Sequence, residues 1–469
     1  MSAVEVDEVI SASWVVPVET DETLKDHSVV LKDGVIVDIL PTDAARGKYA
    51  AKTWTNLPGK VLLPGFVNAH THSPMVLLRG VSDDIALREW LQTVIWPAEG
   101  QFVKADFVKE GAELAILEMI RGGTTTFNEM YWFPESVAES VVRSGIRAAI
   151  GIIAIEFPFA SYGTGPDDYF TKGRATRERF LGEDLISWTI SPHAPYTCSE
   201  GTLEKVKALS EEFKCPIHIH LHETAAECEA SAAGNRDSPD CHMSDQKCTP
   251  LANLKRMGML NDRLVAVHMT TLTEEEIKWC AEAGASVVHC PSSNMKLASG
   301  FCRVADLMSA GVNVALGTDG ASSNNTLDML AEMKLAAMLA KGVASNAKAV
   351  PALSALRMAT LNGAKALGLQ SKVGSLKVGK QADIIAIDMD TPDTWPSPTV
   401  AADPGFTPVS HIVYSTTRNQ VTDSWVRGRR LMKEREVLTL PMAELKEKAG
   451  KWGSKVTEFL VGMKANAAA

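Results

Sequence analysis

Eight short apolar or β-branched runs are spread along the chain, and most of them are followed by a segment with helical periodicity. The runs cover residues 60–70, 124–131, 147–156, 186–194, 216–223, 264–271, 286–293 and 313–320. Alternation of strands and helices is typical of a parallel sheet. Eight such units predict either a closed (β/α)8 barrel or, as the alternative, an open doubly wound sheet.

The positions of the polar residues favour the barrel. Segments 110–123 and 200–213 have apolar residues at helical spacing, as crossover helices require. The polar side chains at or just past the expected strand ends are His70, His72, His193, His220, Glu223, His268, His289 and Asp319. In a closed barrel these ends surround one point, where the active site lies. We therefore predict an α/β fold built on a (β/α)8 TIM barrel.

The two ends of the chain follow a different pattern. Residues 28–40 contain two β-like runs around Asp-Gly, which is a hairpin signal, and residues 373–440 contain further short strands. We expect these ends to pair with each other in a small β-sandwich domain outside the barrel. The predicted units are a composite β domain of residues 1–60 plus 373–440, a metal-dependent barrel of residues 61–372, and a C-terminal helical segment of residues 441–469.

Composition excludes several classes of partner. The formal net charge of the 469 residues is -10, which disfavours nucleic acid because phosphates require a basic face. No apolar run reaches the roughly 18 residues of a membrane-spanning helix, so we expect no membrane segment. The acidic N-terminus does not resemble a secretory signal, and we expect a cytoplasmic protein. The expected partner is a small-molecule substrate, with a homodimer left open.

Cysteine usage agrees with that compartment. The eight cysteines all lie in the middle of the chain and form no Cys-x-x-Cys pair, so reduced thiols are the simplest interpretation. Cys241, His242 and Cys248 could be imagined as a zinc knuckle, but their spacing fits no standard site. We expect residues 230–250 to be a surface insertion.

The first expected strand ends in two histidines one residue apart, within the sequence PGFVNAHTHSPM. Alternate side chains of a strand share one face, so His70 and His72 could bind the same small cation. Two hydrogen-bonded loop histidines are the alternative.

Two further strands offer candidate ligands. The fifth contains His218, His220 and His222, and periodicity alone does not say which of them reaches a metal. The eighth ends in GTDGASSNN, where Asp319 is either a ligand or a turn former. Each residue has an ordinary structural explanation by itself, but their shared placement at strand ends favours a metal centre.

The motifs PGFVNAHTH, SPHAPYTCS, HLHET, HCPSSNMKL and GTDGASSNN follow one another in this order. They resemble the amidohydrolase superfamily, and within it the chlorohydrolase and adenosine-type deaminase branch that includes 5′-methylthioadenosine/S-adenosylhomocysteine deaminases. The resemblance covers nearly the whole chain. It implies a hydrolase that acts on the C–N bond of a cyclic amidine.

The resemblance also implies a metal centre. It assigns His70, His72, His220 and Asp319 as ligands of one divalent ion, preferably Zn²⁺, although these ligands would also accept Fe²⁺ or Mn²⁺. Relatives with two metals carry a bridging lysine on the fourth strand, and ISWTISPHA has none, so one metal is expected. A metal held by four ligands keeps a position for water, whose pKa falls toward ~7 on zinc.

Catalytic roles are implied for three residues. Asp319 would accept the proton of the water, His268 would orient the nucleophile, and Glu223 would protonate a ring nitrogen and pass a proton to the departing ammonia. Alternatively, Glu223 caps the following helix and His268 is a buried hydrogen-bonding residue. His289 is expected near the metal without a catalytic role.

Substrate contacts are implied by REWLQTVIWPAE, the segment after the first strand. Trp90 would pack on the ligand, and Glu99 would accept hydrogen bonds from the ribose hydroxyl pair. Glu223 and His193 would contact the purine. The alternative is a core tryptophan and an exposed helical glutamate.

We therefore predict hydrolytic deamination of a 6-aminopurine nucleoside to its inosine form plus ammonia. The candidate substrates are 5′-methylthioadenosine, S-adenosylhomocysteine and adenosine. Arg174 and Arg177 are candidates for binding the carboxylate of S-adenosylhomocysteine, with surface arginines as the alternative. Other possible functions are a deaminase or chlorohydrolase of a free base, pterin or triazine ring, and a catalytically silent scaffold, which is disfavoured because no expected ligand is missing.

Overall fold

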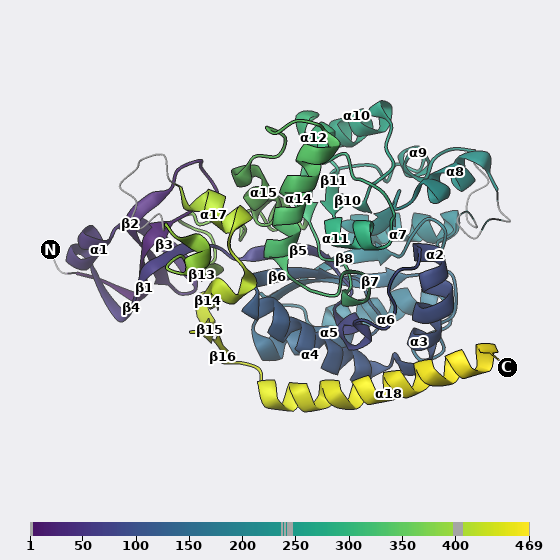
Figure 1. The fold of residues 1–469 in the computed structure, drawn as a ribbon, viewed down its shortest axis with the longest axis horizontal. Helices are drawn as coiled ribbons and strands as arrows, with labels where there is room; N and C mark the ends of the chain where they lie inside the picture. Colours follow the sequence, from purple (N-terminus) through teal and green to yellow (C-terminus); the bar gives the residue numbers. More distant parts are fainter. Residues whose placement is uncertain (1–2, 236–237, 239–240, 242–246, 397–406, 469) are drawn as a thin grey trace.

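The computed structural model describes residues 3–235, 238, 241, 247–396 and 407–468. Its main body is a sheet of eight parallel strands in the order β12-β11-β10-β9-β8-β7-β6-β5 (Figure 1). The strands are β5 (Phe66–Thr71), β6 (Thr124–Glu129), β7 (Arg147–Ala154), β8 (Ile186–Pro192), β9 (Ile217–Leu221), β10 (Leu264–His268), β11 (Ser286–His289) and β12 (Asn313–Leu316). All eight predicted strands are present, and the predicted barrel fold is confirmed.

Burial explains why these runs become strands. Every residue of the barrel strands is buried except the first three of β8. Helices cover the outside of a parallel barrel and side chains fill its inside, so its strands are apolar almost throughout instead of alternating with polar residues. The run RAAIGIIA, which forms β7, is an example.

Hydrogen bonds join the first and last barrel strands. The main-chain N–H of Thr318 donates to Oδ1 of Asn68 over 2.9 Å, and Nδ2 of Asn68 donates to Oγ1 of Thr318 over 2.7 Å. The main-chain N–H of Asp319 donates to the carbonyl of His70 over 3.0 Å. The barrel is therefore nearly closed, with His70 and Asp319 side by side.

Helices surround the barrel (Figure 1). They are α4 (Ala105–Arg121), α5 (Pro134–Ser144), α6 (Pro166–Arg179), α7 (Glu200–Phe213), α8 (Ala225–Ala233), α9 (Pro250–Arg256), α10 (Glu274–Ala283), α12 (Val304–Ser309), α14 (Met329–Val343), α15 (Ala352–Met358) and α16 (Leu361–Ala366). The helix expected at 110–123 starts earlier, at Ala105, and stops before its Gly pair. The helix expected at 200–213 has those bounds, and the side chain of Ser199 accepts its capping hydrogen bond.

Shorter helices follow strands β5, β11 and β12, after the carboxyl ends of these strands. They are η1 (Ser73–Leu78), α2 (Leu87–Trp90), η2 (Leu91–Ile95), α3 (Trp96–Phe102), α11 (Pro291–Lys296) and α13 (Ala321–Asn324). The η2 segment is a π-helical turn between α2 and α3. Such turns are often found at functional sites.

The second sheet is mixed and lies beside the barrel (Figure 1). Its strands are β1 (Val4–Val15), β2 (Leu24–Lys32), β3 (Val35–Pro41), β4 (Tyr49–Pro64), β13 (Ile384–Asp388), β14 (Val421–Val426), β15 (Arg429–Lys433) and β16 (Glu436–Val437). The remaining short helices of the two flanks are α1 (Thr42–Lys48), η3 (Pro392–Thr394), α17 (Pro408–Tyr414) and η4 (Arg418–Gln420). The antiparallel pairing of β4 with β13 confirms that the two ends of the chain form one sheet.

The predicted hairpin in this sheet is also present. Strands β2 and β3 are antiparallel, and Asp33 and Gly34 between them have φ angles of 52° and 78°. Both angles are left-handed, as a tight hairpin turn requires. The proposed domain boundaries remain a prediction, and β4 itself continues through residue 60 to Pro64.

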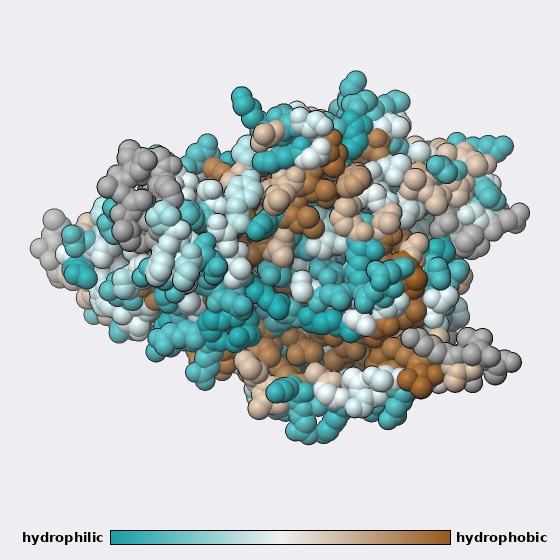
Figure 2. All heavy atoms as spheres, in the orientation of Figure 1, coloured by the Kyte–Doolittle hydropathy of each residue, from teal (hydrophilic) through white to brown (hydrophobic). Residues whose placement is uncertain are grey.

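A long C-terminal helix, α18 (Met442–Ala468), runs along the barrel (Figure 1). Apolar side chains gather where it meets the body (Figure 2). The ring of Trp452 lies 5.1 Å from that of Phe107, and its Nε1 donates to the carboxylate of Glu110 over 2.7 Å. Within the described part of the chain, no helix has both the length and the apolar character needed to cross a membrane.

Candidate active site

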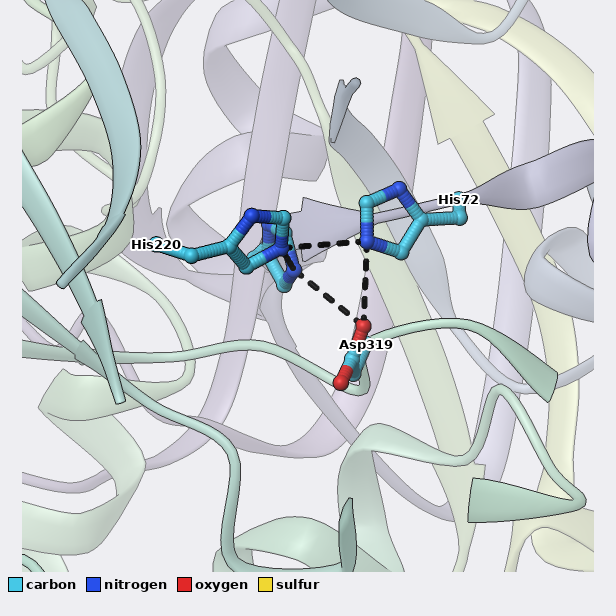
Figure 3. Close-up of side chains that lie close together, drawn as sticks. His72, His220 and Asp319 are labelled. Carbon is cyan, nitrogen blue, oxygen red and sulfur yellow. Dashed lines mark hydrogen bonds and ion pairs between the residues drawn. The ribbon is translucent and has the colours of Figure 1, made fainter. Parts of the chain in front are cut away.

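Four side chains meet at the carboxyl ends of three barrel strands. His70 lies in β5 and His72 directly follows it, His220 lies in β9, and Asp319 follows β12. One ligand atom from each lies within 4.8 Å of all the others (Figure 3). The separation of these residues in sequence, up to 249 positions between His70 and Asp319, shows that the barrel topology creates the cluster.

The three histidines present the same ring atom to the centre. Nε2 of His220 lies 3.2 Å from Nε2 of both His70 and His72. Nδ1 of His72 bonds to the carbonyl of Met130 over 2.6 Å, and Nδ1 of His220 bonds to the carbonyl of His193 over 2.7 Å. A carbonyl only accepts, so Nδ1 carries the proton in both rings and Nε2 carries a lone pair. Lone pairs this close repel each other unless a cation lies between them.

Asp319 completes the donor set. Its Oδ1 lies 3.2 Å from Nε2 of His70 and 3.3 Å from Nε2 of His72. Its Oδ2 accepts hydrogen bonds from the hydroxyls of Ser293 and Ser323, over 2.7 and 3.1 Å. Burial acts to raise the pKa of Asp319, but as the pH falls the neighbouring imidazoles become protonated before the aspartate does, and the hydrogen bond that His70 then donates, together with their positive charge, holds the pKa of Asp319 well below its usual range. The aspartate is therefore ionised.

Burial keeps the imidazoles neutral. It lowers the pKa of His70 to about 4, and it lowers that of His220 well below the ordinary value. Neutral imidazoles and one carboxylate are the usual ligands of a catalytic divalent metal. The residues present therefore fit such a metal.

Only one of the three histidines in the HIHLHE motif belongs to this donor set. Nε2 of His218 lies 2.8 Å from Nδ1 of His70, on the side of that ring away from the centre. His222 lies past the end of β9 with a φ of 52°, and its ring bonds instead to the main chain of Thr271 and Leu251. The change of backbone direction separates His222 from its two neighbours, which the strand periodicity could not indicate.

Glu223 and His268 lie beside the cluster. Oε2 of Glu223 is 3.8 Å from Nε2 of His268, whose Nδ1 bonds to Oδ1 of Asn294 over 2.8 Å. Burial and the negative charge of Asp319 raise the pKa of Glu223 to about 8. Glu223 is therefore protonated at neutral pH and can donate a proton. Its side chain does not cap α8, since Thr224 does so.

Two residues of the site, Asp319 in the cluster and His268 beside it, have unusual backbone conformations. The φ angles of His268 and Asp319 are 76° and 63°, in the left-handed region. Non-glycine residues rarely adopt this region, because it costs energy and persists only where the surrounding structure holds the residue in place. Such residues are concentrated at functional sites.

A cavity of about 570 Å³ opens onto the cluster. Trp90, Glu99 and His193 line it, together with His72 and Glu223. Its volume is in the range of small-molecule sites.

Besides Glu223, the predicted substrate-binding residues Trp90, Glu99 and His193 present different groups to this cavity. Trp90 is buried, and its Nε1 has no hydrogen-bond partner among the described residues. Glu99 accepts a hydrogen bond from the hydroxyl of Tyr131 over 2.8 Å, and burial raises its pKa to about 7. Nδ1 of His193 bonds to the hydroxyl of Thr197 over 3.0 Å.

Other candidates lie elsewhere. Arg174 bonds to Glu212 with both Nη atoms and Arg177 lies over the ring of Phe213, and neither lines the cavity. His289 is buried near the end of β11 and outside the four-residue donor set. His242, from the imagined zinc knuckle, lies outside the described residues.

Several residues that hold the site together have no role predicted from the sequence. His218 supports His70, Tyr131 bonds to Glu99, Asn294 bonds to His268, and Ser293 and Ser323 bond to Asp319. Ser293, Asn294 and Ser323 stand inside the quoted motifs HCPSSNMKL and GTDGASSNN, which was the available signal.

Comparison with known proteins agrees with this fold and site. The profile of the Amidohydrolase family matches residues 61–431, which is most of the chain. The protein belongs to the amidohydrolase family.

Individual relatives are similar over almost their whole length. A 5-methylthioadenosine/S-adenosylhomocysteine deaminase of Teredinibacter turnerae is 42% identical over 454 residues, covering 96% of this chain and 98% of the relative. The protein of the same name from Aquifex aeolicus is 40% identical over 436 residues, covering 93% and 95%. The crystal structure of an adenosine deaminase from Xanthomonas campestris with bound zinc has a TM-score of 0.92 and 44% identity, covering 97% of this chain and 100% of that one.

Proposed function

We propose that this protein is a metal-dependent aminohydrolase that converts a 6-aminopurine nucleoside to its inosine form and ammonia. The candidate substrates are 5′-methylthioadenosine, S-adenosylhomocysteine and adenosine. The observation that carries the proposal is that one cavity is lined by Glu223, by Glu99 and by three members of the cluster, namely His72, His220 and Asp319, with His70 buried behind them. The names of the relatives at about 40% identity support the same reaction.

The four clustered residues would hold one divalent metal ion, for which zinc is the first choice because the relative from Xanthomonas campestris contains it. When bound, such an ion supplies a water molecule that is acidic enough to act as a nucleophile near neutral pH. The side chain of Asp319 keeps an ionised carboxylate at the site, where it can accept a proton from the attacking water.

Glu223 is the acid of the reaction. Its raised pKa of about 8 keeps the proton on the carboxyl group until substrate binds. Transfer of that proton to the ring nitrogen beside the amino-bearing carbon makes the carbon more electrophilic. The Glu223 carboxylate can then carry the proton that Asp319 took from the water to the amino group, which leaves as ammonia, and the proton on the added oxygen returns to Glu223 as the carbonyl group forms. His268, fixed by Asn294, orients the attacking water.

Glu99, Trp90 and His193 bind the substrate. The carboxylate of Glu99 accepts hydrogen bonds from two adjacent ribose hydroxyls, and the indole of Trp90 packs on the ligand. His193 contacts the edge of the purine. A substrate without ribose leaves the carboxylate of Glu99 without these hydrogen bonds. We therefore expect kcat/KM for such a substrate to be lower than for a nucleoside.

A panel assay tests the proposal. Loss of adenine absorbance is followed with adenosine, 5′-methylthioadenosine, S-adenosylhomocysteine, adenine and guanine. We expect turnover of at least one nucleoside and little turnover of the free bases. No turnover of any nucleoside would contradict the proposal.

The alternative substrate class is a free base, pterin or triazine ring. The variant Glu99→Gln separates the two. For a nucleoside enzyme, kcat/KM for nucleosides falls in this variant. If the native protein turns over a free base efficiently and Glu99→Gln retains that turnover while nucleoside turnover is lost, the free-base activity is favoured.

We also propose a compartment, a class of partner and an assembly for the enzyme. A formal charge of -10 supports the absence of a nucleic-acid partner, and eight free cysteines support a reducing compartment such as the cytoplasm. A homodimer is the candidate assembly, and measurement of the mass in solution tests it.

A further inference from the structure

The cavity has a polar end and an apolar end. The metal-binding cluster and Glu223 form the polar end. The ring of Tyr131 lies 6.4 Å from that of His72, and the hydroxyl of Tyr131 donates to Glu99. The side chain of Tyr131 therefore connects Glu99 to the cluster. The next residue, Trp132, begins the apolar end.

The segment after β7, residues 155–161, forms most of the apolar end. All of its residues except Glu156 line the cavity. The ring of Phe159 stacks on that of Trp132, with centroids 4.5 Å apart and planes 2° apart. Phe157 is 48% exposed. Because Phe157 also lines the cavity, its ring is accessible to a ligand bound there.

The one charged residue of this segment faces elsewhere. The carboxylate of Glu156 accepts hydrogen bonds from the main-chain N–H of Ser199, over 3.1 Å, and the hydroxyl of Thr202, over 2.8 Å. These bonds hold it at the start of α7. The segment therefore presents apolar surface, with a single serine hydroxyl, to the cavity.

The cationic side chain in the cavity lies at the other end. Of the described residues that line it, Arg88 is the one lysine or arginine. Its guanidinium lies 4.9 Å from the ring centroid of Tyr196, which is 6.0 Å from the ring of His193. Its charge also acts on Glu223. Arg88 is therefore near the purine end of the proposed substrate.

We propose that the wall of Trp132, Phe157 and Phe159 selects a nucleoside with a short apolar 5′ substituent, such as a methylthio group, over one with a zwitterionic amino-acid chain. The inference rests on the proposed function: with the purine at the cluster and the ribose hydroxyls at Glu99, the 5′ substituent extends toward the apolar end. Thioether sulfur packs favourably on aromatic rings. A carboxylate placed there would lose water without gaining a cationic partner.

Comparison of kcat/KM for 5′-methylthioadenosine, adenosine and S-adenosylhomocysteine tests the inference. We expect the methylthio compound to exceed each of the others by roughly 10- to 200-fold, the discrimination that a small apolar group provides. In Phe157→Ala the ratio of methylthioadenosine to adenosine falls, and in Phe157→Arg the ratio of S-adenosylhomocysteine to methylthioadenosine rises. Both changes are at a half-exposed side chain, so the core is preserved.

Phe301→Ala is the matched control. Phe301 is 52% exposed and does not line the cavity, so its removal leaves all three ratios unchanged. If S-adenosylhomocysteine equals or exceeds methylthioadenosine, or if Phe157→Ala leaves the ratios unchanged while nucleosides are still deaminated, this inference is wrong and the proposed function stands. If no nucleoside is deaminated, the proposed function fails and this inference fails with it.

Discussion

Nδ1 of His70 lies 2.8 Å from Nε2 of His218, inside the barrel below the metal-binding cluster. The other two histidines of the cluster are oriented by main-chain carbonyls, those of Met130 and His193. His70 is thus held by a side chain where its neighbours are held by the backbone. A partner at Nδ1 fixes the tautomer in which Nε2 is free to bind a cation.

Removal of this partner should weaken metal binding. In His218→Leu the ring of His70 loses its acceptor, and we expect the dissociation constant for zinc to rise roughly 10- to 100-fold. His218→Gln, whose side-chain oxygen can reach the same position, should retain most of the affinity. Competition with a chromogenic chelator measures both. Equal affinity in His218→Leu and the native protein would show that His218 does not position His70.

Substitution of Glu223 should affect the reaction and spare the metal. Glu223→Gln keeps the size of the side chain but cannot cycle a proton, so kcat should fall by roughly 10²- to 10⁴-fold. The metal content should equal that of the native protein because Glu223 is not among the four clustered residues. Steady-state kinetics and metal analysis of the same sample test this. A variant that retains native kcat would exclude Glu223 as the acid.

Glu129 should make the protein less stable as the pH rises. Burial raises its pKa from 4.5 to about 8, so between these values the folded state holds a proton that the unfolded state has lost. The free energy of unfolding then decreases with pH by up to about 1.4 kcal/mol per pH unit. Glu129→Gln, which still accepts from the main-chain N–H of Ser73, should remove this contribution.

Urea denaturation at pH 5.5 and 8 measures the effect of Glu129→Gln. The variant should gain stability relative to the native protein at pH 8 and differ less at pH 5.5. Glu229→Gln, at an exposed position, is the control. Parallel pH dependences for the native protein and Glu129→Gln would contradict the assignment.

The buried ion pair of Arg147 and Asp383 should couple the barrel to the second sheet. Nε and Nη2 of Arg147 donate to the two oxygens of Asp383 over 2.9 and 3.1 Å, and both side chains are 2% exposed. Arg147→Met leaves a buried carboxylate without its cation, and we expect a loss of about 3–5 kcal/mol. The double variant Arg147→Met/Asp383→Leu should lose less, as thermal or urea unfolding would show. A fully stable Arg147→Met would mean that the pair contributes little.

The barrel could be predicted from the sequence because each of its strands is a short apolar or β-branched run in the local sequence. Runs such as RAAIGIIA can be recognised without knowledge of the segments they pair with. The three histidines of the cluster could be found in the same way, because each lies at or next to the end of such a run. The choice among His218, His220 and His222 was not available from periodicity, since it depends on where β9 ends and how the chain turns at His222.

Contacts made between distant segments could not be predicted in the same way. The carbonyl of Met130 that orients His72 has no sequence signal, because every residue has a carbonyl. Arg174 and Arg177 were reasonable candidates for a substrate carboxylate, but α6 places them at a surface ion pair and on Phe213. The apolar cavity wall of Trp132, Phe157 and Phe159 could not be predicted, because it forms only when the fold packs the segment after β7 against Trp132.

The central claim is that His70, His72, His220 and Asp319 bind one divalent metal ion. The most direct test is metal analysis of protein purified without chelator, repeated after chelation and addition of zinc. We predict one divalent ion per chain, recovered on addition of zinc and lost in Asp319→Ala. Protein that contains no divalent metal and takes up none when zinc is added would contradict the account.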